Sequence, residues 1–392
     1  MSYTEYEYER AFISMLEGEG WQYLSGSSIT RNSLREVLYL DDMEKFLSKF
    51  YPELSSQEIH KIIDQLRLIG AQSEFAVLHK VYLDIVNGFQ FIMHGLKPIK
   101  IKLIDFDTPQ NNIFRVVNQF PVEYSDNGRS NTRRPDILLF VNGIPLCIIE
   151  LKNPAGNDTI YDAWEQIYYR YWRDIPNLLH YCQMACISDG VHTRLGTVRT
   201  LYEHFYSWRK VNDFEKISHI SYWDLLISEL EKFYSADNDD NILRSGSVSG
   251  LKVFRENNYS PYEETESMIK GVFSPSRFLE ILRDYIYFPD SIYDNEEQAV
   301  ICRYPQFFAS RLLKQSIIKS ITEENGKGGT YFGATGCGKT FTMAFLARQL
   351  SMRCPEIGSP TIIIIVDRED LQKQAAKLFT RSTEFLNIGE VR

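Results

Sequence analysis

Two apolar runs separated by Asn142-Gly143 form the clearest pattern of hydrophobic and polar positions in the chain. The first run, at 137–141, reads ILLFV, and the second, at 144–149, reads IPLCII. Such β-branched and aromatic runs around an Asn-Gly pair predict a β-hairpin. Charged residues lie only at the far ends, where the two strands return to one another, and they are Asp136, Glu150 and Lys152. Glu150 and Lys152 are two positions apart, so we expect them on one face of their strand.

The register of this hairpin decides whether Asp136 shares a face with Glu150. With a two-residue loop at Asn142-Gly143, Asp136 lies opposite Ile149 and faces away from Glu150. A three-residue loop with a left-handed glycine places Asp136 opposite Ile148, on the Glu150 face and diagonal to it. Metal binding by both carboxylates therefore requires an odd-numbered loop, or a bulge between the loop and the strand ends.

Periodicity elsewhere predicts helices and further strands around the hairpin. Helical spacing is expected at 4–20, over most of 33–96, and in the aromatic segment 159–173. Strands are expected at 101–106, 113–124 and 183–188. The first two would precede the hairpin in one mixed sheet, and the third would close it. The expected fold class is therefore α/β.

A second motif follows in the C-terminal third. Residues 329–340 read GTYFGATGCGKT, which completes the pattern G-x-x-x-x-G-K-T between a short apolar lead at 330–332 and a helical run. Backbone N–H groups of such a loop surround phosphates, the lysine meets the β- and γ-phosphates, and the threonine ligates Mg²⁺. The run TIIII at 361–365 then predicts a buried parallel strand. The predicted nucleotide ligands are Gly333, Ala334, Thr335, Gly336, Cys337, Gly338, Lys339 and Thr340, the last of these also a metal ligand.

Composition limits these interpretations. The 392 residues are 44% hydrophobic and 24% charged, enough for two or three globular domains. No apolar stretch approaches twenty residues and the N-terminus is no signal peptide, so we expect a cytoplasmic protein without a membrane segment. The net charge of −9 lacks the overall basic character of a DNA-binding protein, so DNA contact requires a local patch or a partner. A polar, acidic, Ser/Gly-rich stretch at 235–250 predicts an exposed linker or loop.

At this point the residues carry a resemblance to a known family, the restriction (R) subunit of type I restriction-modification enzymes. It covers, with gaps, the chain from about residue 5 onward. The segments that carry it are LIDFDTPQNNIFRVVNQF, RRPDILLFVNGIPLCIIELKNP, AWEQIYYRYWRDIP and ISDG. The resemblance implies a PD-(D/E)xK-type nuclease domain, with a mixed sheet flanked by helices, at 1–258. It also implies a truncated, partial RecA-like superfamily 2 helicase lobe at 259–392.

The resemblance also implies roles for particular residues. Asp136 and Glu150 would bind the metal, with Lys152 as the third catalytic residue. An early helix in the family supplies a further acid, which Glu9 matches best and Glu7 matches as the alternative. The family's Gln-x-x-x-Tyr pattern is shifted here, because Gln166 is followed by Tyr171 at the fifth position. A one-residue shift aligns Tyr171 and displaces Gln166. In the motor part, Gln306 with Arg303 resembles an adenine-reading segment, and Arg368 belongs to a segment that contacts DNA.

The resemblance also implies the cofactors, the partners and the activity of the protein. The cofactors are Mg²⁺ and ATP, and the partners are double-stranded DNA and the modification (M) and specificity (S) subunits. The complete subunit translocates DNA with ATP and cleaves it. No DEAD-type acidic box follows position 368, so we expect little ATP turnover from this chain, either as a fragment or as a truncated gene product. Two alternatives stay open: a DNA-repair helicase-nuclease, and an assembly module with an inactive nuclease fold.

Overall fold

The structure is a computed structural model that describes residues 5–67, 73–92, 98–153, 158–209, 211, 263–288, 298–333, 336–358 and 360–365, with positions 369, 378, 379 and 386. The predicted linker at 235–250 and the boundary at 258 lie outside the described residues. None of the described helices is long and apolar enough to cross a membrane.

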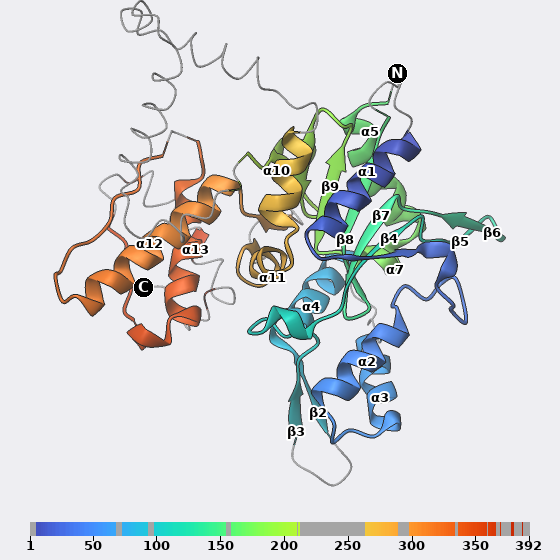
Figure 1. The fold of residues 1–392 in the computed structure, drawn as a ribbon, viewed down its shortest axis with the longest axis horizontal. Coiled ribbons are helices and arrows are strands. Elements are labelled where there is room, and N and C mark those ends of the chain that lie inside the picture. The colour runs from blue at the N-terminus through green and yellow to red at the C-terminus, as the bar shows by residue number, and fades with distance from the viewer. Residues whose placement is uncertain are drawn as a thin grey trace, which may run out of the picture.

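A seven-stranded mixed sheet forms the centre of the molecule (Figure 1). Two of its neighbouring pairs are parallel, β1 with β4 and β8 with β9, and the other pairs are antiparallel. The strands, in spatial order, are β1 (Gln22–Ser25), β4 (Phe114–Asn118), β7 (Ile137–Val141), β8 (Ile144–Leu151), β9 (Met184–Ser188), β10 (Thr193–Gly196) and β11 (Tyr206–Ser207). The expected α/β class with a mixed sheet is confirmed.

Three two-stranded sheets stand outside this central sheet. They are β2 (Phe89–Ile92) with β3 (Pro98–Ile101), β5 (Val122–Asp126) with β6 (Arg129–Arg133), and β12 (Ile286–Tyr287) with β13 (Val300–Ile301). The single strands expected at 101–106 and 113–124 were therefore wrong in extent. After β3, the Asp105 carboxylate accepts the Asp107 and Thr108 N–H groups and forms a turn. After β4, Gln119 is left-handed at φ 49° and the chain leaves the sheet.

Helices cover the sheet and extend beyond it (Figure 1). α1 packs on β1 and β4, α5 packs on β8 and β9, and α10 packs on α1 and β10. The N-terminal helices are α1 (Glu5–Gly18), α2 (Leu40–Phe50), α3 (Ser56–Arg67) and α4 (Glu74–Asn87). After the hairpin follow α5 (Ile160–Glu165), the π-helix η3 (Gln166–Tyr171), α6 (Trp172–Asp174) and α7 (Pro176–Leu179). Later come α10 (Glu263–Val272), α11 (Pro275–Asp284), α12 (Tyr304–Thr322) and α13 (Lys339–Arg353). Short 3₁₀ turns lie at Gly26–Ser28, Pro109–Asn111, Tyr202–His204 and Pro355–Ile357.

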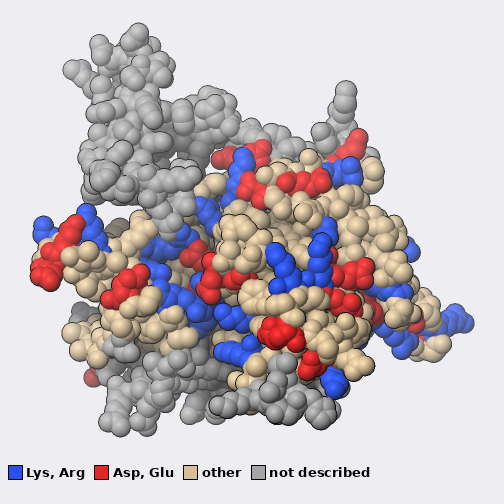
Figure 2. Space-filling view, turned by 60° about the horizontal axis from the view of Figure 1, so that its bottom comes forward, with Lys and Arg blue, Asp and Glu red and all other residues tan. Residues whose placement is uncertain are grey.

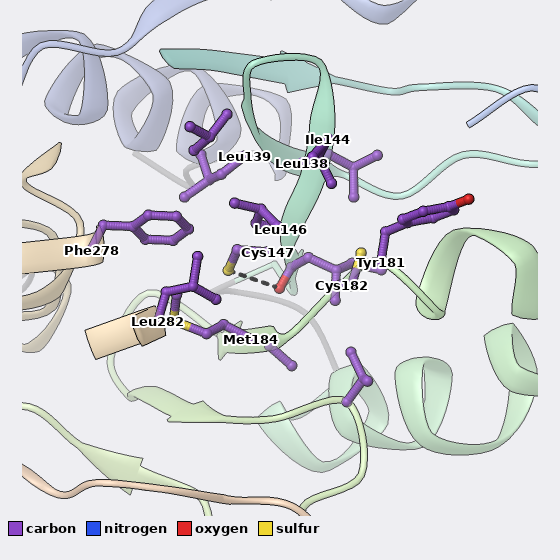
Figure 3. Close-up of a cluster of buried hydrophobic side chains, with 14 of the residues drawn as sticks. Leu138, Leu139, Ile144, Leu146, Cys147, Tyr181, Cys182, Met184, Phe278 and Leu282 are labelled. Carbon is purple, nitrogen blue, oxygen red and sulfur yellow. Dashed lines mark hydrogen bonds between the residues drawn. The ribbon is translucent and has the colours of Figure 1, made fainter. Parts of the chain in front are cut away.

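The hairpin strands β7 and β8 are buried along their whole length. Phe278 and Leu282 of α11 lie beside Leu146, Cys147 and Met184 (Figure 3). Burial on both faces explains why the two runs are continuously apolar rather than alternating. The charged residues at the open end of this hairpin are therefore held by two strands that are fully buried in the core.

Candidate functional site

The hairpin turn has two residues, not three. Asn142 and Gly143 both have positive φ, 50° and 81°, and Val141 pairs directly with Ile144. Of the two possibilities that the sequence left open, the three-residue loop does not form. The register instead shifts by one residue between Leu139 and Phe140, a β-bulge located between the loop and the strand ends. The requirement stated from sequence, an odd loop or an intervening bulge, is met by the bulge.

The bulge turns Asp136 toward Glu150. Ile137 pairs with Ile149, so the next position along places Asp136 opposite Glu150. Residues directly opposite in an antiparallel pair share a face of the sheet. Asp136 Oδ2 also accepts the Leu151 N–H at 2.8 Å, which fixes its carboxylate across the open end of the hairpin. Without the bulge, Asp136 would face the other side.

The turn itself is clamped by a buried asparagine. Asn142 is 1% exposed; its Nδ2 donates to Leu103 O at 2.9 Å and to Asn112 Oδ1 at 2.8 Å, and its Oδ1 accepts the Ile113 N–H. A Cβ on Gly143 would lie 2.1 Å from Tyr39 O, so the backbones touch there. The segment LIDFDTPQNN thus helps to position the hairpin.

Glu150 is fully buried and accepts two side-chain hydrogen bonds. Tyr171 Oη donates to Glu150 Oε1 at 2.8 Å, and Gln166 Nε2 donates to Glu150 Oε2 at 2.7 Å. Burial, and after it the Asp136 carboxylate, raise the pKa of Glu150 well above its usual range, while Lys152 opposes the shift. A bound cation would favour the ionised form of Glu150, so ionisation of this carboxylate and cation binding would favour each other.

Gln166 connects Glu150 to Lys152. While its Nε2 binds Glu150, its Oε1 accepts from Lys152 Nζ at 2.9 Å. This pair of bonds fixes the orientation of the amide, because only the oxygen accepts from an ammonium. The lysine is thereby held at the site through a neutral amide.

The π-helix brings Gln166 and Tyr171 together although they are five positions apart rather than four. Segment η3 begins at Gln166 and ends at Tyr171, and a π-helix bonds residue i to residue i+5. The wider turn puts both side chains on one face, where Gln166 Nε2 also contacts Tyr171 Oη at 2.7 Å. The expectation that aligning Tyr171 displaces Gln166 was wrong, because the extra residue is absorbed as a π-bulge.

Glu9 reaches the site through two amides that sequence reasoning missed. Asn118 Nδ2 and Gln119 Nε2 each donate to the Glu9 carboxylate at 2.7 Å. Gln119 Nε2 also lies 3.3 Å from Asp136 Oδ1 and so bridges the two acids. Glu9 is 5% exposed, whereas the alternative Glu7 is exposed. The available signal was the pair of amides directly after an apolar strand.

Glu5 was not singled out from sequence. Partial burial, together with the Asp136 carboxylate, raises its pKa. Within the described part of the chain, no group of three or more His, Cys, Asp or Glu comes together as a metal cluster. The two carboxylates that face each other are those of Asp136 and Glu150, and oxygen donors of this kind suit a hard cation.

The Gly-rich loop lies at the start of α13. Gly336 and Gly338 have φ of 81° and 80°, and Lys339 Nζ donates to Gly333 O at 2.9 Å. Half-exposed Cys337 follows Gly336, and partly buried Thr340 lies in the first turn of α13. Ala334, Thr335 and Arg368 lie outside the described residues.

Gln306 packs against this loop. Its Nε2 lies 3.4 Å from Cys337 O and from Gly338 O, and a Cβ on Gly338 would come within 2.2 Å of it. Its Oε1 accepts the Arg303 N–H, and the Arg303 guanidinium lies over the Tyr206 ring. The two residues expected to read adenine are thus joined to each other, and Gln306 touches the loop.

The strands expected around the Gly-rich loop were wrong for the described residues. Positions 331–333 and 361–365 are not strands, and Phe332, Ile363 and Ile365 are 93%, 77% and 89% exposed. A parallel strand forms only beside partner strands. No described residue after Ile301 belongs to a strand, so these apolar runs have no ladder to join.

Two models of known protein families match this chain. Residues 2–204 match the family model of the type I restriction enzyme R protein N terminus, and residues 306–389 match that of the SWI2/SNF2 ATPase. The two matches define the class: a restriction-enzyme subunit of mixed α/β fold that continues into an ATPase-like part.

Curated relatives narrow the class to one family. The chain is 29% identical over 390 residues to the type I restriction enzyme MjaIXP endonuclease subunit of Methanocaldococcus jannaschii, covering 96% of the chain and 34% of that protein. It is 24% identical over 397 residues to the HindI endonuclease subunit of Haemophilus influenzae, covering 98% and 33%. The chain therefore belongs to the type I restriction enzyme R protein family. It spans about a third of the length of these relatives.

Proposed function

We propose that the chain holds a Mg²⁺-dependent endonuclease site of the PD-(D/E)xK type, which cleaves double-stranded DNA. The single observation that carries the proposal is the placement of Asp136 opposite Glu150 by the β7–β8 bulge. Lys152 lies on the same strand end and is held by Gln166. This set of two carboxylates and one ammonium matches the chemistry of phosphodiester hydrolysis.

Asp136 and Glu150 would hold the metal. Mg²⁺ bound there would supply Lewis-acid chemistry to a phosphoryl oxygen and a water molecule. Lys152 places a positive charge where the phosphate develops negative charge, and it can orient the attacking water. Gln166 and Tyr171 hold the Glu150 carboxylate in one rotamer. Glu9, braced by Gln119, adds a further acid beside Asp136.

The second site is proposed to bind ATP. Three observations support ATP binding by this loop. Gly336 and Gly338 have left-handed backbone conformations, and the Lys339 ammonium donates to the Gly333 carbonyl. The Gln306 side chain also contacts the loop at Gly338. Thr340 would ligate Mg²⁺ and Gln306, with Arg303, would read the base. We propose that this site belongs to a RecA-like part at 259–392, that the nuclease part is 1–258, and that Arg368 contacts DNA.

Activity of the complete subunit is proposed from the family. ATP-driven translocation of double-stranded DNA and assembly with modification (M) and specificity (S) subunits would accompany cleavage. The chain's net charge of −9 favours a subunit whose sequence reading comes from partners.

The decisive experiment is Mg²⁺-dependent cleavage of plasmid DNA by wild type and Asp136→Ala. We expect the variant to lose cleavage while keeping its fold. Asp189→Ala is a matched control, because that carboxylate accepts the Val191 and His192 N–H groups in a turn rather than a donor at the Asp136–Glu150 pair. Retained cleavage in Asp136→Ala, or equal loss in both variants, would refute the assignment.

A further inference from the structure

The β5–β6 ribbon is separate from the central sheet. Its strands pair from Val122↔Arg133 to Asp126↔Arg129 and are joined by the two-residue turn Asn127-Gly128. In Figure 1 the ribbon projects from the body of the molecule beyond the edge of the sheet. A Cβ built on Gly128 meets no atom within 4 Å, so this residue of the tip faces open space.

The base of the ribbon is firmly held. Val122 is fully buried, and the Arg133 guanidinium binds the Asp174 carboxylate with Nε–Oδ2 at 2.7 Å and Nη2–Oδ2 at 2.6 Å. The same guanidinium lies 4.9 Å from the centre of the Tyr124 ring. A two-stranded ribbon alone is marginally stable in water. These anchors therefore hold the ribbon at a fixed orientation.

The outer part of the ribbon carries hydrogen-bond donors and one arginine, Arg129, which pairs across the ribbon with Asp126. Arg129, Ser130, Asn131 and Thr132 are all exposed, in contrast to Arg133. Residues 122–134 contain three arginines and two acids, but Arg133 at the base is paired with Asp174, which leaves Arg129 and Arg134 as the exposed arginines. One of the acids, Glu123, is paired with Arg35 at 3.2 Å. Figure 2 shows Lys and Arg side chains at the outer end of this projection.

The ribbon leads directly into the candidate nuclease site. β6 ends at Arg133, exposed Arg134 and buried Pro135 follow, and the next residue is Asp136. The base of the ribbon is therefore three residues before Asp136, the residue that lies opposite Glu150.

We propose that the β5–β6 ribbon enters a groove of double-stranded DNA and holds the duplex against the Asp136–Glu150 site. This proposal rests on the proposed nuclease function. Strands of five residues extend about 17 Å, whereas the major groove of B-DNA is about 12 Å wide and about 8.5 Å deep and admits a two-stranded ribbon. Arg129 and Asn131 share one face because side chains alternate along β6. That face offers a guanidinium and an amide to phosphates and base edges.

The test is duplex binding by the whole chain, measured by fluorescence anisotropy of a labelled duplex in EDTA from low to moderate salt. Arg129→Ala is expected to weaken binding about three- to tenfold and to reduce the slope of log affinity against log salt by about 0.9, the signature of one lost phosphate contact. Arg129→Ala/Asn131→Ala is expected to weaken it further. Lys61→Ala, an exposed lysine on α3, is the matched control and should bind as wild type.

Each outcome decides the proposal. Unchanged duplex binding by the double variant overturns it. So does unchanged duplex binding combined with lost capture of the modification and specificity subunits, since the ribbon would then be a protein-docking element. Cleavage by Asp136→Ala is scored separately. Failure of the ribbon variants to weaken binding, with loss of cleavage in Asp136→Ala, refutes the ribbon alone and leaves the nuclease assignment intact.

Discussion

Replacing Gly143 by alanine tests whether the hairpin turn sets the register at the candidate site. The chain provides its own control, because two Asn-Gly turns have nearly the same backbone: Gly143 at φ 81° and Gly128 at φ 77°. An L-residue at such a φ costs about 1–2 kcal/mol. Only Gly143 adds a clash, since its Cβ would lie 2.1 Å from Tyr39 O, whereas that of Gly128 meets nothing within 4 Å.

The magnitude follows from this difference. Overpacking against fixed backbone costs about 1–3 kcal/mol, and Tyr39 N–H also donates to Gly143 O at 2.8 Å, a bond that the displaced turn would weaken. We expect Gly143→Ala to lose about 2–5 kcal/mol of unfolding free energy and Gly128→Ala about 2 kcal/mol or less. Gly143→Val should lose more than either and should lower cleavage.

Urea unfolding measured by far-UV circular dichroism gives the two free energies, and plasmid cleavage gives the functional effect. Residual cleavage should fall in Gly143→Ala, because a shifted turn changes how Asp136 faces Glu150. Equal destabilisation by Gly143→Ala and Gly128→Ala would refute the reasoning, since backbone conformation alone would then account for both.

The remaining predictions concern single side chains. Glu150→Gln should abolish cleavage yet stabilise the metal-free chain at neutral pH, as thermal unfolding in EDTA would show. The reason is that burial raises the pKa of Glu150 in the folded chain. The contribution of Glu150 to folding stability is therefore full below pH 4.5 and is lost as the pH rises through the raised pKa. Lys339→Ala should weaken ATP binding in calorimetry without lowering Mg²⁺-dependent cleavage of relaxed plasmid, and equal affinity in mutant and wild type would reject the Gly-rich loop as the phosphate site. Gln119→Leu should lower Mn²⁺ affinity and cost about 1–3 kcal/mol, because Glu9 loses a buried donor; unaltered Mn²⁺ affinity would contradict its positioning role.

The sequence predicted the hairpin because local rules determine it. An Asn-Gly pair between apolar runs fixes the turn, and two-sided burial fixes the strands. The bulge was foreseen only as one of two ways to satisfy the register, although Pro145, a residue type that marks bulges within strands, lies at the register shift. The helix expected at 4–20 and the strand expected at 183–188 are confirmed as α1 (Glu5–Gly18) and β9 (Met184–Ser188).

Long-range contacts account for what sequence reasoning missed. Segment 113–124 is divided at left-handed Gln119, whose amide is held between Glu9 of α1 and Asp136 just before β7. The π-bulge at Gln166 likewise depends on Glu150, sixteen residues earlier. Neither conformation is preferred by its own residues. Each is stabilised by hydrogen bonds to partners that the local pattern does not contain.

The carboxylates of the candidate site are held in place by neutral amides rather than by positively charged side chains. Glu9 and Asp136 share the Gln119 amide, and Glu150 binds the Gln166 amide. An amide satisfies a buried carboxylate with a hydrogen bond but contributes no net charge. Had arginines held these acids, the pairs would be neutralised and a cation would gain little from binding. Because the braces are neutral and Lys152 is bound through Gln166, a divalent cation would meet carboxylates that are held by amides rather than by cationic side chains. Its charge would favour the ionised form of Glu150, whose pKa is raised by burial.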